Sequence, residues 1–386
     1  LASTTMANPD LKWETTITRN LGLDFTLLRG KLTGSLEAYI NTTKDLLIDF
    51  PTGGSGYDNQ YRNMGKTENR GFEATITWNA INKKDYGLSF NANIGFNKNE
   101  VKDLGARGDF GFNSRWASTQ IGNDYLIAVG NSVGKMIGYR NDGRYEVSDF
   151  DWDGSNWTLK KGIADDSGVV GRLRPGMLKL VDIDGDYKVD SNDIVEIGDA
   201  NPAATGGFGI SARAYGFDLT ANFNFSIGND VYNANKVEFT STGGYQYRNM
   251  IDIMAEGKRW TNIDPLTNEL CNDPARLAEL NVNTTMWSPY MSNMVFSDWA
   301  VEDASFLRLN TLTLGYTLPE TLTRRVGINS LRFYVTGYNV FCITSYSGYD
   351  PEVSTIRRNG NNLTPGVDYS AYPKSRQLVV GLNLNF

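Results

Sequence analysis

The last ten residues, which read QLVVGLNLNF, constrain the fold of this chain more than any other segment. Side chains alternate between the two faces of an extended strand with a period of two. One face of this segment would therefore carry only apolar side chains, from Leu378 to Phe386, and the other mostly small or polar ones. Such a strand suits a sheet that has lipid on one side and water on the other.

The same alternation recurs along the chain over segments of about ten residues, which is the length of a strand that crosses a membrane in a barrel. Strands of soluble sandwiches are usually shorter. The pattern predicts about nine to eleven strands. The alternation is interrupted near Thr311, where we expect a bulge, and again around Gly337–Asn339. Between these two strands, Glu320–Val326 is expected to form one helical turn. The clearest of the predicted strands are Thr15–Leu27, Lys31–Thr42, Gly71–Ala80, Tyr86–Asn97, Phe217–Ile227, Ser305–Thr317, Leu331–Phe341 and Gln377–Phe386.

The connections between these strands alternate between short and long. Short turns are expected at Leu28–Gly30, Ile81–Asp85 and Tyr215–Gly216. Outer-membrane barrels have short periplasmic turns and long outer loops. We therefore predict an all-β fold, a transmembrane antiparallel β-barrel, in which residues 1–386 form part of one barrel domain. Its long extracellular loops are expected near 43–70, 98–205, 228–303 and 343–376, and Phe386 is expected at the periplasmic rim.

Composition narrows the possible functions. The chain has no histidine, which excludes histidine-based catalysis and histidine metal ligands within it. A net charge of −7 argues against a nucleic-acid partner. Cys271 and Cys342 are too few for a disulfide framework, and we expect two free thiols. The first ten residues do not resemble an export signal. Because a barrel in lipid cannot leave strand edges unpaired, the first and last strands are expected to pair with sequence outside this chain.

One acidic segment, Val181–Glu196, predicts a calcium loop. Calcium is held by about six to eight oxygen atoms, often from carboxylates on a tight loop. Five aspartates occupy the first, third, fifth, ninth and twelfth positions of a register like that of an EF-hand, and the backbone carbonyl of Lys188 occupies the seventh. The alternative is an acidic, solvated turn. The five aspartates are Asp182, Asp184, Asp186, Asp190 and Asp193.

Several short blocks, which keep a fixed order along the chain, carry a resemblance to a known family. They are NPDLKWE at 8–14, TKDLL at 43–47, NRGFE at 69–73, PG at 175–176 with DIDGD at 182–186, EDASFLRL at 302–309, TLGYTLP at 313–319, NVF at 339–341 and YSGYDPE at 346–352. On these blocks the chain resembles the carboxy-terminal part of the barrel in the SusC/RagA family of TonB-dependent outer-membrane transporters. The resemblance covers essentially the whole chain, but the family's plug domain, TonB box and early strands have no counterpart here.

The resemblance implies a barrel of about 22 strands in the outer membrane, with an internal plug. It also implies a SusD-like surface lipoprotein as a lid, and TonB, energised by the proton gradient, which acts through the missing amino-terminal part. The expected function is active import of oligomeric glycans or peptides, with no catalysis and no cofactor other than the calcium predicted above.

Two alternatives from the residues remain open: a passive outer-membrane porin, and a soluble β-rich glycan-binding or glycan-cleaving protein. Residues that contact a substrate cannot be assigned from the sequence. Aromatic residues in the long loops could stack on sugar rings, but packing among loops, against the lid protein or at the membrane interface is the favoured explanation. Charged residues on the polar face could line a transport path or hold the plug through ion pairs. The loop aromatics are Trp152, Trp157, Tyr245, Tyr247, Trp260, Trp287, Tyr290 and Trp299, and the charged residues are Glu37, Glu73, Asp218, Arg308 and Arg332.

Overall fold

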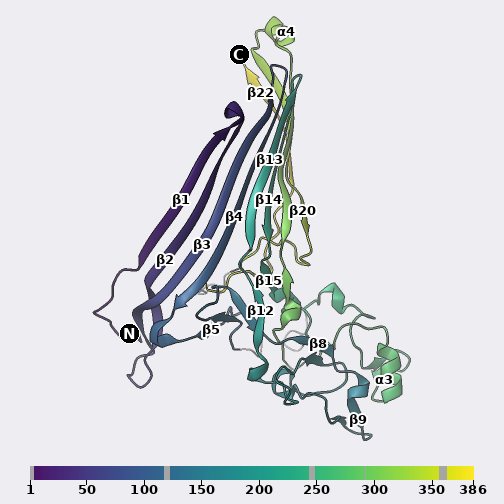
Figure 1. Cartoon of the computed structure of the whole chain (residues 1–386). Coiled ribbons are helices and arrows are strands. Elements are labelled where there is room, and N and C mark those ends of the chain that lie inside the picture. The colour runs from purple at the N-terminus through teal and green to yellow at the C-terminus, as the bar shows by residue number, and fades with distance from the viewer. Residues whose placement is uncertain (1–3, 117–121, 243–247, 292, 356–362) are drawn as a thin grey trace.

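A computed structural model describes residues 4–116, 122–242, 248–291, 293–355 and 363–386. Within these residues, one antiparallel sheet of nine strands dominates the fold (Figure 1). Every strand in this sheet pairs with its neighbour in the sequence of long strands, without a crossover. In spatial order the strands are β1 (Thr15–Leu27), β2 (Leu32–Pro51), β3 (Asn59–Asn82), β4 (Tyr86–Asp103), β13 (Ala204–Ala214), β14 (Phe217–Ile227), β19 (Phe306–Thr317), β20 (Ser330–Thr344) and β22 (Gln377–Asn385).

The remaining elements are short and belong to the long connections, except for α4. The strands are β5 (Phe110–Phe112), β6 (Tyr125–Ile127), β7 (Lys135–Gly138), β8 (Asn141–Arg144), β9 (Phe150–Trp152), β10 (Trp157–Leu159), β11 (Leu178–Leu180), β12 (Val195–Asp199), β15 (Asp230–Asn233), β16 (Ile263–Asp264), β17 (Glu269–Leu270), β18 (Val301–Asp303) and β21 (Val367–Asp368). The helices are α1 (Ser167–Val170), α2 (Ala234–Glu238), α3 (Pro274–Asn281) and α4 (Glu320–Thr323). None of the helices in the described residues has both the length and the apolar character needed to cross a bilayer.

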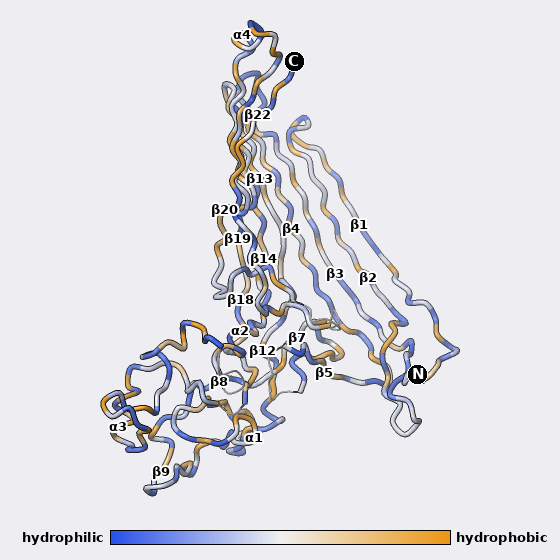
Figure 2. Tube along the Cα trace, turned by 180° about the vertical axis from the view of Figure 1, so that it is seen from behind, coloured by the Kyte–Doolittle hydropathy of each residue, from blue (hydrophilic) through white to orange (hydrophobic). Residues whose placement is uncertain are grey.

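The nine-stranded sheet has one apolar face that no other part of the described chain covers. Leu21, Leu382 and Phe217 on this face are 78%, 58% and 54% exposed. Its aromatic rings pack sideways across strands, as between Phe208 and Phe223 with their centroids 4.6 Å apart. Orange and blue residues alternate along the long strands in Figure 2. The sheet therefore has the apolar face and the polar face that the sequence pattern predicted. Within the described residues, no second sheet covers the apolar face as it would in a soluble β-sandwich.

Short turns and the carboxyl terminus lie together at one end of this sheet, and the long connections lie at the other (Figure 1). The turn after β3 contacts the turn after β13, because the Tyr215 amide donates to the Asp85 carbonyl at 2.9 Å. The linker after β19 holds α4 and a following 3₁₀ turn at Arg324–Val326, which confirms the predicted helical turn. Three of the four predicted long connections, those after β4, β14 and β20, are present at the other end of the sheet.

The two irregular segments, in β19 and β20, lie at the positions that the sequence pattern predicted. The register between β19 and its neighbours shifts between Leu309 and Thr311, which confirms the predicted bulge. The opposite stretch of β20 departs from the ladder at Asn339, whose φ of +49° lies in the left-handed region. The amide of Asn339 donates to the carbonyl of Lys374 at 2.8 Å, which ties this irregularity to the segment before β22.

The predicted loop over 43–70 is wrong in its bounds. Strands β2 and β3 have 20 and 24 residues and remain paired as far as Pro51 and Asn59, so the true loop is only 52–58. About ten residues suffice to cross the membrane, and beyond it both faces of a strand meet water. Apolar alternation then stops although the backbone pairing continues, so the sequence pattern underestimates the strands. Bulges around Asp45 and Leu46 also break the period of two.

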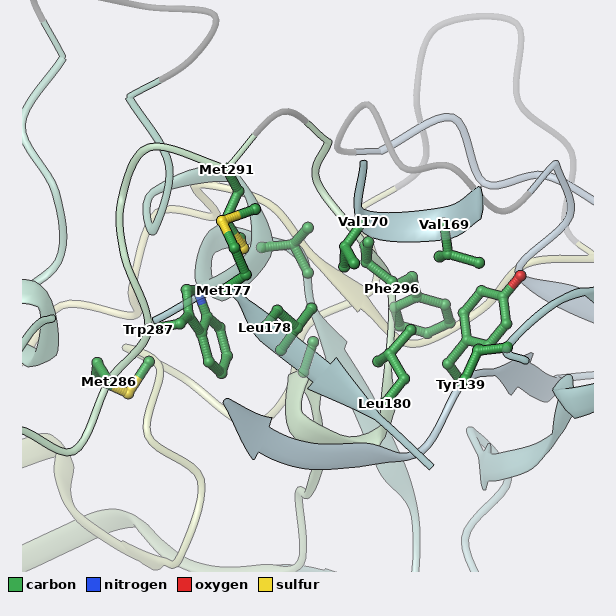
Figure 3. Close-up of a cluster of buried hydrophobic side chains, with 14 of the residues drawn as sticks. Tyr139, Val169, Val170, Met177, Leu178, Leu180, Met286, Trp287, Met291 and Phe296 are labelled. Carbon is green, nitrogen blue, oxygen red and sulfur yellow. The ribbon is translucent and has the colours of Figure 1, made fainter. Parts of the chain in front are cut away.

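The long connections at 104–203 and 228–305 fold together into a subdomain with its own hydrophobic core. Figure 3 shows part of this core, in which Leu178, Leu180 and Phe296 lie beside Val170. Within 98–205 the structure has short strands, which pair β7 with β12 and β8 with β11. Because β4 pairs directly with β13, none of them belongs to the main sheet.

Candidate functional site

The acidic segment after β11 forms a tight loop in which three carboxylates meet. One oxygen each of Asp182, Asp184 and Asp193 lies within 4.8 Å of the others. Asp193 is fully buried, and its two oxygens accept from the backbone amides of Ile183 at 2.7 Å and Asp190 at 2.8 Å. These contacts fix the side chain of Asp193 at the base of the loop.

The other predicted ligands lie outside this group. Asp186 accepts from the Lys188 amide at 2.8 Å. Asp190 forms an ion pair with the Lys188 ammonium group at 3.1 Å, and it also accepts from the Asn192 amide. The structure therefore gathers three of the five aspartates that the sequence register selected, and Asp186 and Asp190 do not join this group.

The charge in this loop is concentrated. Desolvation, with the nearby carboxylates of Asp186, Asp193 and Asp182, raises the pKa of Asp184 above its ordinary value. A bound cation would relieve this repulsion. The loop also places Tyr187 at a φ of +67°, at the position where an EF-hand loop has glycine.

The predicted loop aromatics fall into different environments. Trp260 and Trp287 are 2% and 5% exposed and belong to the packed interior of the subdomain, so packing explains them. Tyr290 is exposed, and Trp299 packs against Trp287 with ring centroids 4.6 Å apart. Tyr245 and Tyr247 lie outside the described residues.

The two remaining aromatics, Trp152 and Trp157, line a small pocket. They face each other across the β9–β10 hairpin with ring centroids 4.8 Å apart. The pocket has a volume of about 210 Å³, and its wall also includes Arg172 and Arg174. Within the described residues neither arginine has an ion-pair partner, and Arg174 reaches only the Tyr290 carbonyl at 3.4 Å. Burial and the neighbouring charge of Arg172 lower the pKa of Arg174.

The sequence analysis did not select the two arginines of this pocket. They stand in an ordinary Arg-Leu-Arg run before Pro175, and only the fold brings that run beside the hairpin. No signal in the sequence alone would have found them.

The charged residues of the polar face are largely paired within the chain. Arg332 forms two hydrogen bonds with Asp218, at 2.8 and 2.6 Å. The buried Arg308 is held by Asp350 and by other groups of the same loop. Arg308 and Arg332 thus have ion-pair partners within the chain, and the prediction that they hold a plug stays a prediction.

Glu37 and Glu73 differ from the other charged residues of the polar face. They lie directly opposite each other on β2 and β3. Within the described residues, neither of these carboxylates has an ion-pair partner. They are the members of the predicted set that remain free to meet a positive group in the interior.

Comparison with known proteins places this architecture in a family. Residues 1–198 match the model of the TonB dependent receptor-like β-barrel. TonB-dependent receptor P3 of Formosa agariphila is 30% identical over 99% of the chain. TonB-dependent receptor SusC of Bacteroides thetaiotaomicron is 27% identical over 98% of it. The chain covers 35% and 32% of these two proteins, so it spans about a third of the length of the curated relatives it matches.

Solved structures support the same fold. The RagAB peptide transporter superposes with a TM-score of 0.69 at 23% identity, over 99% of this chain and 36% of that one. The RagAB peptide importer in its closed-closed state gives a TM-score of 0.68 at 24% identity, over 98% of this chain and 36% of that one. The open sheet is therefore a section of a wall that closes with further strands. The chain belongs to the TonB-dependent receptor β-barrel family and lies in the bacterial outer membrane.

Proposed function

We propose that this chain forms part of the barrel of a TonB-dependent importer that takes oligomeric glycans or peptides across the outer membrane. Transport of this kind is gated binding and release, without the making or breaking of bonds in the cargo, so the protein is not an enzyme. The observation that carries the proposal is a membrane-crossing wall of the TonB-dependent receptor family with an extensive folded subdomain on its outer side.

The polar face of the wall supports passage of a hydrophilic cargo. Asn91, Asn93 and Asn97 project from this face of β4, opposite small or polar residues of β3 and β13. Gly207 and Gly209, which lie opposite Asn93 and Asn91, keep the polar face of the neighbouring strand β13 free of bulk. An inner surface of this kind is wet and offers hydrogen bonds along its length.

A SusD-like lipoprotein is the partner we propose for the outer subdomain. Several large apolar side chains there remain exposed well away from the lipid-facing band, among them Leu266 at 83%, Val282 at 75% and Tyr290 at 69%. Apolar groups that face water in this number favour coverage by another protein. Within the same proposal, the Trp152–Trp157 pocket is the place we expect to contact cargo, because aromatic faces and uncompensated arginines meet there.

Uptake by a deletion strain tests the function and separates it from a passive porin. The gene that encodes this chain is deleted, and growth is measured on defined glycans and on defined peptides as sole nutrients. We expect growth on one of these classes to be lost and to return with the intact gene. We also expect a protonophore or loss of TonB to stop uptake, whereas a porin would continue to pass its solutes. Cargo recovered in shortened form after incubation with the purified protein would contradict a purely transporting role.

We further propose that the acidic loop binds calcium, with Asp182, Asp184 and Asp193 as the gathered carboxylates and with Asp186, Asp190 and the Lys188 carbonyl as the remaining predicted ligands. The support is the meeting of three carboxylates in a loop with an EF-hand-like register. The ion would brace an outer loop and take no part in chemistry.

Limited proteolysis of the membrane-embedded protein, with calcium or with a chelator, tests the calcium proposal. We expect faster cleavage near 182–193 when calcium is removed, and an Asp193→Asn variant should behave like the chelated parent. Asp153→Asn, in another exposed turn of the subdomain, serves as the control. Equal cleavage with and without the ion removes the proposal.

A further inference from the structure

Basic residues align in one row across the apolar face of the main sheet. The strand registers pair Arg19 with Ile40, Ile40 with Arg70, and Arg70 with Lys98. Residues that pair in this way on adjacent antiparallel strands point to the same face. Three cations thus cross β1 to β4 on the face that contacts lipid.

This row lies immediately beyond the apolar band. The adjacent row toward the short turns consists of Leu21, Ala38, Phe72 and Phe96, and apolar rows continue from there to Trp78 and Phe90. Because the long loops lie at the same end as the cations, the row marks the outer boundary of the hydrocarbon. Cations at this height stand at the headgroups of the outer leaflet.

The next row toward the long loops contains Glu68 and Glu100, whose carboxylates neutralise part of the positive charge of this cluster. Arg70 forms an ion pair with Glu68 at 2.7 Å, and Lys98 lies 4.0 Å from Glu100. Lys102 also pairs with both glutamates. Arg19 has no ion pair in the described part of the chain. Four cations therefore face two carboxylates, which leaves two positive charges in excess on a chain whose net charge is −7.

These cations remain accessible. The side chains of Arg70 and Lys98 are 52% and 76% exposed even though both have acidic neighbours. A depression of about 770 Å³ lies beside them, and its wall includes Phe72 and Phe96. The surface thus offers positive charge, apolar side chains and space at one height.

We propose that the row Arg19–Arg70–Lys98 binds the phosphate groups of phosphorylated glycolipid in the outer leaflet. Guanidinium groups match phosphate oxygens with paired hydrogen bonds, and each cation near an anionic lipid surface strengthens binding about fivefold. Phe72 and Phe96 pack against the acyl chains below the headgroup. The row fixes the height and rotation of this section of the barrel in the membrane, and it does so independently of the cargo.

The test measures glycolipid retained by the full-length protein. The protein is purified in mild detergent, exchanged into nanodiscs that contain either phosphorylated or enzymatically dephosphorylated lipid A, and analysed by native mass spectrometry. We expect the parent protein to retain the phosphorylated form strongly and the dephosphorylated form weakly. The triple variant Arg19→Gln, Arg70→Gln, Lys98→Gln should lose about a hundredfold in retention.

A matched control removes positive charge at the opposite boundary. Lys83 and Lys84 are exposed in the turn between β3 and β4, at the short-turn end. Their double replacement by glutamine should leave retention unchanged. A reciprocal variant, Glu68→Gln with Glu100→Gln, should raise retention, which keeps the proposal testable if the triple variant does not fold.

Three results would overturn the proposal. One is equal retention of phosphorylated and dephosphorylated lipid by the parent. Another is equal loss in the Lys83/Lys84 control, which would indicate a general charge effect. The third is displacement of the glycolipid by millimolar inorganic phosphate alone, which would indicate a site for free phosphate. Because these readouts need no cargo, their failure is distinct from failure of the import function.

Discussion

Tyr187 has a backbone conformation that is unfavourable for a residue with a side chain. A φ of +67° is costly for a residue with a Cβ atom, by roughly 1–2 kcal/mol. The ring is 62% exposed, so replacing it removes little packing. We predict that Tyr187→Gly stabilises the acidic loop by about 1 kcal/mol, seen as slower proteolysis within 182–193.

The matched change is Gly185→Ala, two residues earlier. Gly185 has a φ of +79°, and a Cβ atom there would meet nothing within 4 Å. Its replacement should therefore cost a similar amount through backbone strain alone. Equal rates of proteolysis for both variants and the parent would show that backbone strain contributes little to the stability of this loop.

Asp166 makes the outer subdomain sensitive to pH. Its carboxyl is fully buried and accepts from the Leu180 amide at 2.7 Å. Burial raises the pKa of Asp166 to about 7 from an ordinary value of 3.8. A carboxyl whose folded pKa is raised favours folding while it is protonated, so its contribution is complete below pH 3.8 and is lost as the pH rises through about 7.

We predict that Asp166→Asn removes this dependence, because asparagine keeps an oxygen for the Leu180 amide and does not ionise. Protease resistance of residues 104–203 should fall between pH 4.5 and pH 8 in the parent and stay nearly level in the variant. A parent with the same resistance at both pH values would contradict the assignment.

At the scale of elements, one buried ion pair connects strand β19 to the loop that follows β20. Arg308 is 2% exposed and donates to Asp350, which is 6% exposed, at 2.6 Å. We predict that Arg308→Met destabilises this connection by about 3–5 kcal/mol, because it leaves the Asp350 carboxylate buried without a compensating cation. The measurement is cleavage of residues 345–355 by protease.

Lys374 offers the comparison for Arg308. It pairs with Glu352 in the same loop, but its side chain is 49% exposed. Exposed pairs contribute less than about 1 kcal/mol, so Lys374→Met should change cleavage little. If the two variants are equally sensitive, burial is not what makes the Arg308 pair important.

The long strands could be predicted because lipid on one side imposes a period of two. In β14, Phe217 to Ile227 alternates without a break, and the structure pairs all of it. The alternation no longer predicts strands where a strand extends beyond the lipid. Beyond Thr42 the strand continues with water on both faces, so the sequence no longer distinguishes strand from loop.

The outer subdomain was not predictable in the same way. Its strands have only two to five residues, too few to show a period, and its core joins residues as distant as Tyr125 and Val367. The acidic register was visible because its residues are adjacent in sequence. Which three carboxylates meet was not visible, since that depends on how the backbone of the loop turns around the buried Asp193.

For the whole molecule, the decisive property is that the main sheet is open. Within the described residues β1 pairs only with β2, and β22 only with β20. Unpaired backbone groups cost several kcal/mol each in lipid, and the apolar face is incompatible with water. The section therefore depends on both further strands and a membrane.

We predict that these 386 residues, produced alone, do not stay monodisperse in buffer without detergent. Size-exclusion chromatography with light scattering would measure this, with the full-length protein in detergent as the reference. A single monomeric peak in plain buffer, with Leu21 and Leu382 protected from solvent, would contradict the barrel assignment.

Strands β2 and β3 continue beyond the apolar band as a paired hairpin, which we predict to project from the cell surface. Its tip, 52–58, is steadied by residues before β1, since the Asp58 and Met6 amides donate to the carbonyls of Thr4 and Asn59 at 2.8 Å. Gly53 to Gly56 are all exposed. A short epitope inserted at this tip should bind antibodies on intact cells without disturbing the main sheet. The tip of the hairpin is therefore a suitable site for labelling this protein in living bacteria.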